Sequence, residues 1–289
     1  MKISILSAVY NEEEYIIECI KSVSAQRNVN LEHIIVDDFS TDNTSEIVKL
    51  YSSLDSRIIY MHNDIKGKVN AFNMAFRKSS GDILVFLGGD DFITPDSLLY
   101  RHNLFNNIKF LEEPTVFHHA LITASFNPKS SGLRIPRSSK KGNKSGQTTT
   151  FNRLAAELIF PIPNNLPSED CWANIVSEYL CNSFNDSRIV VNYRIHSKNT
   201  VPRGKSFDKF NQYLSAREEA LNVFVNKYPS LKKKLDSKIR LNQFRKEGRI
   251  KDLFFLKGVS IQAKIRAIFY SNAVMYKIRN KFFQFFSGW

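Results

Sequence analysis

The sequence predicts an α/β fold with a mostly parallel sheet flanked by helices. Over the first hundred residues, runs rich in Ile and Val alternate with amphipathic stretches, the order expected when helices cover a parallel sheet. Several of these runs end in polar residues, and ligands bind such sheets at the carboxyl ends of the strands. The 289 residues, 43% hydrophobic and 24% charged, are enough to bury a core of this kind.

Four strands and three helices are expected in this region. The expected strands are apolar runs: KISILSAV (2–9), LEHIIVDDFS (31–40), RIIYMHN (57–63) and DILVFLG (82–88). The expected helices show helical spacing of apolar residues or capping residues at their start: NEEEYIIECIKSVSAQ (11–26), STDNTSEIVKLYSSL (40–54) and GKVNAFNMAFRKSSG (67–81).

The pattern is less regular from about residue 100 to 205. The basic, Gly- and Ser-rich stretch 129–150 is expected to be a mobile loop. A short helix at 151–160, a loop that leads into a helix within 161–180, and a strand within 187–200 follow it. From residue 207 the pattern is helical and increasingly basic. We divide the chain at 1–100, 101–205 and 206–289.

The net charge of +13 is concentrated at the carboxy terminus. Residues 232–289 contain 15 Lys and Arg residues against 3 Asp and Glu residues, so the preceding part carries only about +1. This distribution, without a nucleic-acid-binding motif, argues against nucleic acid as a partner.

The cysteines and the apolar runs indicate a cytoplasmic protein. Three scattered cysteines (Cys19, Cys171 and Cys181) are too few for a disulfide framework or a zinc site. The amino terminus resembles a first strand more than a signal peptide. No apolar run reaches the roughly 18 residues that a membrane span needs.

Asp90 and Asp91 follow directly on the last of the four strands. Adjacent carboxylates repel each other unless something neutralises them. Capping of the next helix does not require them, because Thr94 is the expected cap, with Pro95 in the first turn. Two carboxylates on a turn suit a divalent metal, Mg²⁺ or Mn²⁺, that substrate phosphates and water complete.

Asp37 and Asp38 end the second strand in the same way. They could cap the helix that begins near Asp42, although Ser40 and Thr41 are expected to fill that role. An acid left over can accept a hydrogen bond from a nucleobase imide or a ribose hydroxyl. The preceding connection, VYNEEE, has no glycines and is no dinucleotide fingerprint, but Tyr10 offers an aromatic face to a base.

Five stretches, in this order, resemble the family-2 glycosyltransferases, enzymes with the GT-A fold, a Rossmann-like architecture. They are ILSAVYNEEEYIIECIKSV, IIVDDFSTDNT, KVNAFNMAFRKSSGDILVFLGGDDF, LPSEDCW and YRIHSKNT, and they extend over roughly residues 1–200. Two positions depart from the family pattern: Gly88 replaces a frequent Asp, and Ala8 replaces a common Pro.

The resemblance implies a role for each matching residue. Donor binding falls to Tyr10, Glu12 and Asp38 at the nucleoside, and to Lys68, Asn70 and Asp90 at the diphosphate. The divalent metal would be held by Asp90 and Asp91, with His196 in the YRIH context as a third ligand or phosphate contact and with Arg194 and Lys198 as charge partners.

Glu169 and Asp170 follow Pro167 and Ser168. Taken alone, they read as first-turn acids stabilised by the helix dipole. The resemblance instead implies that Asp170 is the catalytic base, with Glu169 beside it. A single base, a metal and no covalent nucleophile imply one displacement with inversion.

The resemblance therefore implies an inverting glycosyltransferase that uses a nucleotide-diphosphate sugar, with UDP-sugar favoured, and a glycan or lipid-linked acceptor. Residues 1–100 would form the nucleotide-sugar-binding half of the catalytic domain and 101–205 the acceptor-side half. Two alternatives are a nucleotidyltransferase of sugar-nucleotide synthesis and a catalytically degenerate protein that binds membrane or nucleic acid. A nucleotidyltransferase would need a Gly-rich basic loop where this chain has VYNEEE.

The carboxy-terminal segment 232–289 alternates bulky apolar residues with Lys and Arg. It could be a helical element that packs on the body with a solvated basic face. It could also lie at an anionic membrane surface, on the inner face of the cell membrane. Five aromatic residues close to the end favour the membrane: Phe282, Phe283, Phe285, Phe286 and Trp289.

Overall fold

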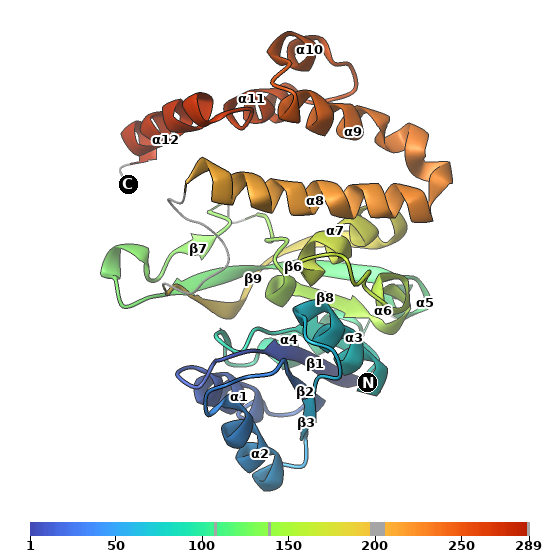
Figure 1. Ribbon diagram of the computed structural model, residues 1–289. Coiled ribbons are helices and arrows are strands. Elements are labelled where there is room, and N and C mark those ends of the chain that lie inside the picture. Colours follow the sequence, from blue (N-terminus) through green and yellow to red (C-terminus); the bar gives the residue numbers. More distant parts are fainter. Residues whose placement is uncertain (107–108, 138–139, 197–205, 288–289) are drawn as a thin grey trace. The chain divides into compact units, whose positions relative to one another are not determined.

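The computed structural model (Figure 1) describes the backbone of residues 1–106, 109–137, 140–196 and 206–287, and their side chains except at 109, 209, 213 and 282–287. The chain forms two compact units, Met1–Lys198 and Asn199–Trp289. The predicted contribution of Lys198 and of the five terminal aromatic side chains lies outside the described residues.

In the described part of the first unit, nine strands form one sheet in the order β3-β2-β1-β4-β8-β6-β9-β5, and β7 pairs with β6. Strands β1 to β4 are mutually parallel and alternate with helices, as predicted. The strands are β1 Lys2–Val9, β2 Asn30–Asp37, β3 Ile58–His62 and β4 Ile83–Phe86, and the helices between them are α1 Ile16–Ser24, α2 Thr44–Leu54 and α3 Lys68–Lys78.

The other half of the sheet is mixed. Strands β6 and β9 are parallel, whereas β8 runs antiparallel to both β4 and β6 and so joins the two halves. The strands are β5 Phe92–Ile93, β6 Thr115–Ala124, β7 Arg134–Ile135, β8 Thr149–Asn152 and β9 Asn182–Arg194. The α-helices are α4 Ser97–Leu104, α5 Lys109–Glu112, α6 Arg153–Ile159 and α7 Glu169–Leu180, and the 3₁₀ turns are η1 Pro128–Ser130 and η2 Gly146–Thr148.

The core of the sheet forms where the sequence has its longest Ile and Val runs. β1 lies between β2 and β4, and Ile3 and Ile5 on it are fully buried. The apolar face of α1, with Cys19 and Ile20, packs into the same core. The predicted α/β fold class is therefore confirmed.

Two local expectations were wrong. The stretch 129–150 is not simply a loop, because its described part contains β7 and the start of β8. Its polar threonines are buried with partners: the Thr148 hydroxyl donates to the Ser145 carbonyl, 2.8 Å away. The helix expected from Thr94 begins at Ser97, after Asp96 in a left-handed conformation with φ 57°. Thr94 instead donates its hydroxyl to the Ile189 carbonyl on β9.

The second unit is helical, as predicted. Its elements are α8 Phe207–Lys227, the 3₁₀ turn η3 Pro229–Leu231, α9 Lys232–Lys246, α10 Ile250–Phe255, α11 Ile261–Phe269 and α12 Ala273–Ser287. A buried ion pair joins α8 to α9, with Arg245 Nη2 2.6 Å from Glu218 Oε1. Among the described residues, no helix combines the length and apolar character needed to cross a bilayer.

Candidate active site

The carboxyl ends of β1, β2 and β4 lie at one edge of the sheet. The strand register pairs Val9 with Asp37, and the Asp38 amide donates to the Val9 carbonyl at 2.8 Å. A Cβ placed on Gly89 would lie only 3.1 Å from Glu12 Cγ. The polar residues that follow these three strands, widely separated in the sequence, are therefore neighbours at this edge.

The connection after β1 is fixed by hydrogen bonds to the connection after β2. Asn11, at φ 55°, accepts from the Thr41 amide at 2.8 Å and donates its own amide to the Ser40 hydroxyl. Ser40 and Thr41 thus do not cap α2 as expected; Asp42 accepts from the Thr44 amide instead. Tyr10, the residue before Asn11, is 45% exposed.

Tyr10 and Asp38 both contact the connection that leads into α3. The Lys66 ammonium group is 4.7 Å from the centre of the Tyr10 ring. Oδ1 of the buried Asp38 accepts from Asn63 Nδ2 and from the Gly67 amide, both at 2.7 Å. Asp38 therefore shapes the start of α3, and its Oδ2 makes no hydrogen bond to any residue that the structure describes.

Asp90 and Asp91 are held by the end of β9. Asp91, only 2% exposed, accepts from the Arg194 amide at 2.8 Å, and Arg194 Nε donates to the Asp90 carbonyl at 2.9 Å. Burial, followed by the charge of Asp90, raises the pKa of Asp91 well above its usual value. His196 Nε2 lies 3.1 Å from Asp90 Oδ2.

This pair partly fits the divalent metal that the sequence predicts. Over the described ranges, no three His, Cys, Asp or Glu side chains are arranged to hold a metal ion, so a preformed protein cage is missing there. The charge of Asp91 is only partly compensated, and a cation would relieve the remaining repulsion from Asp90. Mg²⁺ sites commonly rest on one or two carboxylates plus substrate phosphates. The donor set fits a metal that is shared with a substrate.

Gly88 keeps space open beside this pair. A Cβ at this position would lie 2.6 Å from Asp90 Oδ1, too close for two unbonded atoms. The glycine that replaces the family's frequent aspartate therefore permits the observed Asp90 rotamer.

Lys68 and Glu169 form an ion pair that the sequence did not reveal. They are the first residues of α3 and α7, and Lys68 Nζ lies 3.0 Å from Glu169 Oε1. Burial raises the pKa of Glu169 and Lys68 only partly offsets this, while Glu169 Oε2 is buried without a hydrogen-bond partner among the described residues.

Lys68 also connects this pair with the strand-end acids. Its side chain is 51% exposed. Desolvation lowers the pKa of its ammonium group, but the carboxylates nearby, with Glu169 first among them and Asp90 included, outweigh this and raise it. A half-exposed ammonium group thus lies within electrostatic reach of both acidic groups.

Asp170 has a different environment from its neighbour Glu169. It is only partly buried, and its Oδ1 accepts from the Ser168 hydroxyl at 2.7 Å. That hydroxyl is therefore used to orient Asp170, and it makes no capping bond to the α7 backbone. An oriented, accessible carboxylate is suited to proton transfer with a bound molecule.

Arg194 has a larger part than its sequence context suggested. Besides its bonds to Asp90 and Asp91, its guanidinium group lies 4.7 Å from the Tyr15 ring centre and pairs with Glu18, both from the α1 region. Tyr15 and Glu18 are three residues apart, so the sequence predicts that they share one face of a helix. It does not predict that Arg194 packs against that face. Arg194 thus holds the acid pair through its amide and its Nε, while its role as a charge partner at a metal or diphosphate stays a prediction.

The chain is similar to known proteins in sequence and in fold. Residues 4–108 match the family model "Glycosyl transferase family 2". An uncharacterized glycosyltransferase of Rickettsia bellii is 31% identical over 217 residues, which are 69% of this chain but 30% of that protein. The chain therefore spans less than a third of the length of this relative.

Two solved structures share the fold at low identity. The crystal structure of S. aureus TarS 1-349 in complex with UDP-GlcNAc has a TM-score of 0.61 and 18% identity, covering 95% of this chain and 83% of that chain. The mannosyltransferase PcManGT from Pyrobaculum calidifontis, in complex with GDP-Man and Mn2+, has a TM-score of 0.56 and 15% identity, covering 95% and 69%. The family model and the sequence relative show that the chain carries a family-2 glycosyltransferase domain over residues 4–108, and the two structures show that its fold is of the GT-A type.

Proposed function

We propose that this chain is an inverting glycosyltransferase that moves a sugar from a nucleotide-diphosphate donor, with UDP-sugar favoured, to a hydroxyl group of a glycan or lipid-linked acceptor. One observation carries the proposal: Lys68 Nζ lies 3.0 Å from Glu169 Oε1 at the start of α7, and the Lys68 charge also interacts with Asp90 after β4. A diphosphate needs cations on one side, and an attacking hydroxyl needs a base on the other. UDP-GlcNAc in TarS and GDP-Man in PcManGT support a donor of this chemical class.

The donor would lie along the carboxyl edge of the sheet. Tyr10, Glu12 and Asp38 would bind the nucleoside, since an exposed ring can stack on a base and a carboxylate can accept from an imide or ribose hydroxyl. Lys68 and Asn70, in the first turn of α3, would contact the diphosphate, because the amino-terminal end of a helix favours anions.

Asp90, Asp91 and His196 would hold a divalent metal, Mg²⁺ or Mn²⁺, on that diphosphate. A cation there would stabilise the charge that develops on the leaving phosphate. Arg194 would keep the two carboxylates in place, since it binds Asp91 through its amide and the Asp90 carbonyl through its side chain.

Asp170 would act as the general base. It would take the proton of the acceptor hydroxyl while that oxygen bonds to the anomeric carbon and the bond from this carbon to the diphosphate breaks, which inverts the configuration. The Ser168 hydroxyl supports this role because it fixes one carboxylate oxygen of Asp170. Glu169 is buried against Lys68 and is better suited to position that lysine.

The substitution Asp170→Asn tests this assignment. It keeps the shape of the side chain but removes the base, so transfer should fall by about 10² to 10⁴ while donor binding, measured by calorimetry, persists. Asp96→Asn is the matched control, because asparagine tolerates the left-handed conformation at φ 57°, and it should transfer sugar like the wild type. Sugar transfer by Asp170→Asn at the wild-type rate would show that Asp170 is not the general base.

The expected location is the cytoplasm, with the inner face of the cell membrane as the meeting place for a lipid-linked acceptor. The basic carboxy-terminal unit supports this expectation, because residues 232–289 carry most of the positive charge of the chain.

A further inference from the structure

We propose that an exposed apolar face formed by α10 and α11 binds the surface of an anionic membrane. This contact is separate from sugar transfer and assigns a partner to a part of the chain that the proposed reaction does not use. It narrows the sequence-based expectation of a membrane contact along residues 232–289, which the terminal aromatic residues favoured, to one face of two helices.

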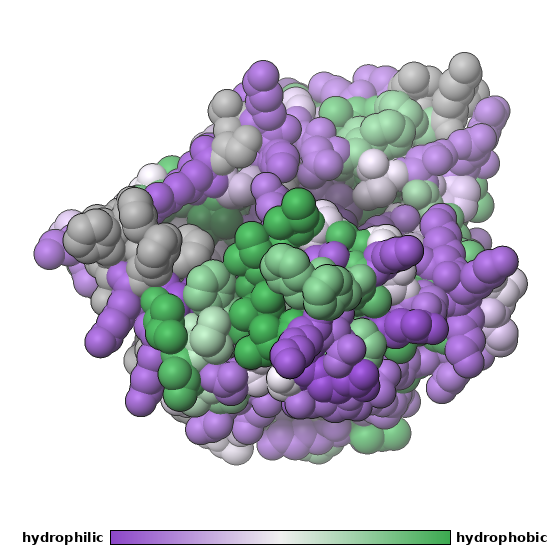
Figure 2. All heavy atoms as spheres, turned by 90° about the horizontal axis from the view of Figure 1, so that it is seen from above, coloured by the Kyte–Doolittle hydropathy of each residue, from purple (hydrophilic) through white to green (hydrophobic). Residues whose placement is uncertain are grey.

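The face consists of large apolar side chains that find no place in the core of the second unit. Phe254, Phe255 and Ile261 are 68%, 78% and 74% exposed, whereas their neighbour Leu253 is fully buried. Helix α10 thus packs through Leu253 and leaves its last two aromatic residues outside. Figure 2 shows hydrophobic side chains gathered over α10 and α11, with hydrophilic residues around them. An apolar patch with a polar rim indicates a binding surface.

The two helices are held together at this face. Lys264 on α11 donates through Nζ to the carbonyl of Phe254 at the end of α10, 2.8 Å away. Ile265 follows Ile261 by one helical turn, and both are exposed, while Ala267 is buried on the opposite side. The exposed apolar residues therefore belong to two helices that are held together, so they can enter a membrane surface together.

The positive charge around the face favours an anionic membrane as its binding partner. Lys251, Lys257 and Arg266 are exposed, and none makes an ion pair with a residue that the structure describes. Arg249, in contrast, is balanced by Glu247 and Asp252. A second copy of this chain would bring the same positive excess and be repelled, whereas anionic lipid headgroups complement it. Phenylalanine beside lysine is typical of elements that lie in the membrane interface.

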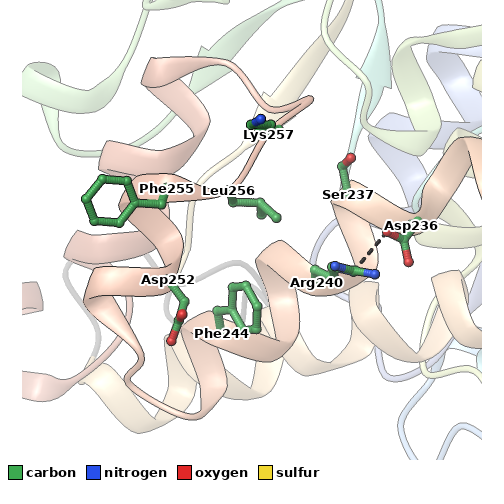
Figure 3. A pocket seen from close by; sticks show the side chains of 8 residues that line it. All are labelled: Asp236, Ser237, Arg240, Phe244, Asp252, Phe255, Leu256 and Lys257. Carbon is green, nitrogen blue, oxygen red and sulfur yellow. Dashed lines mark ion pairs between the residues drawn. The ribbon is translucent and has the colours of Figure 1, made fainter.

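A pocket of about 450 Å³ adjoins the face between α9 and α10 (Figure 3). Phe255 belongs to both the pocket and the face, and Phe244 extends the apolar lining onto α9. The Arg240 cation in this pocket is already paired with Asp236 at 2.9 Å. The pocket therefore does not deepen the apolar face, because most of the side chains that line it are polar or charged.

Sedimentation of the full chain with vesicles tests the proposal. The wild type should bind vesicles of equimolar phosphatidylglycerol and phosphatidylcholine, bind phosphatidylcholine vesicles at least tenfold more weakly, and lose the difference at high salt. The double variant Phe254→Ser/Phe255→Ser should bind the anionic vesicles at least tenfold more weakly. The variant Lys251→Gln/Lys257→Gln should lose about thirtyfold, at roughly 1 kcal/mol for each basic residue.

Matched controls lie on the other unit. Phe126 is also highly exposed, and Lys129 is an exposed lysine in the same connection, so Phe126→Ser and Lys129→Gln should bind vesicles like the wild type. Unchanged thermal transitions would show that the variants are folded.

Three results would overturn the proposal. The first is unchanged binding of anionic vesicles by folded Phe254→Ser/Phe255→Ser. The second is equal binding to neutral and anionic vesicles. The third is wild-type protein that ignores vesicles but self-associates in ultracentrifugation, with loss of this association in the double variant, which would assign the face to a second copy of the chain.

Discussion

Buried charge is compensated differently at two places, one in each unit. In the second unit, the buried Arg245 has partners on several sides: Glu218, the Asn211 side chain and the Tyr270 carbonyl. In the first unit, Asp91 is buried next to another carboxylate, and Glu169 keeps one oxygen without a hydrogen bond among the described residues.

This difference separates a charge that stabilises the fold from charges prepared for a ligand. A buried ion that is fully paired contributes to the local structure, and its removal affects stability. A buried ion that is poorly compensated costs stability and is typical of functional sites. The net charge of a unit does not indicate which buried charges are compensated, because the first unit is nearly neutral and yet contains the acidic site.

Breaking the paired charge should have the largest effect on stability. Glu218→Gln leaves Arg245 buried without its counter-ion, so we expect the second unit to lose about 3–5 kcal/mol. Hydrogen exchange should show faster opening of α8 and α9, with β1 to β4 unchanged. Glu219→Gln, the next residue, is the control. Equal protection of α8 in Glu218→Gln and wild type would refute the structural role of this pair.

Removal of the cation in the first unit should affect ligand binding more than folding. Lys68→Met takes away the group that reaches both acid clusters, and donor affinity should fall about ten- to a hundredfold, as for the loss of a charged hydrogen bond. Lys78→Met, at the other end of α3, is the control for helix stability. If calorimetry finds the same donor affinity in Lys68→Met as in wild type, Lys68 does not contact the diphosphate.

Relief of the acid pair should produce a smaller gain in stability. The raised pKa of Asp91 means that its contribution to folding is full below the unfolded value of about 3.8 and is lost as pH rises through the folded value. Asp91→Asn does not titrate and still accepts from the Arg194 amide. It should therefore exceed the wild type by about 1 kcal/mol in unfolding free energy at neutral pH.

Urea unfolding at several pH values measures this gain. The advantage of Asp91→Asn should shrink as pH falls toward 3.8, where the wild-type carboxyl is also protonated. A variant that is less stable than the wild type at neutral pH would show that Asp91 is compensated in the fold.

The ends of the strands could be predicted well from the sequence, because the spacing and composition of apolar residues depend only on neighbouring positions in the chain. Alternating Ile- and Val-rich strands and helices place Asp38 and Asp90 at one edge without any knowledge of tertiary contacts. The Lys68–Glu169 pair could not be predicted, because it depends on how α7 packs against α3. The Thr-rich β8 was missed for a similar reason: its buried hydroxyls become acceptable only with tertiary partners, such as Thr150 with His119 at 2.9 Å.

The most direct test of the account is calorimetric binding of UDP and GDP in the presence of Mn²⁺. We predict that one of these nucleotides binds the wild type and Asp96→Asn equally, and that EDTA or Asp91→Asn weakens this binding at least tenfold. Mn²⁺ should not increase the affinity for uridine or guanosine, because these nucleosides lack the diphosphate. Binding that is equally strong in EDTA and in Asp91→Asn, or no binding of either nucleotide by the wild type, would contradict the claim that the acids after β4 hold a metal on a donor diphosphate.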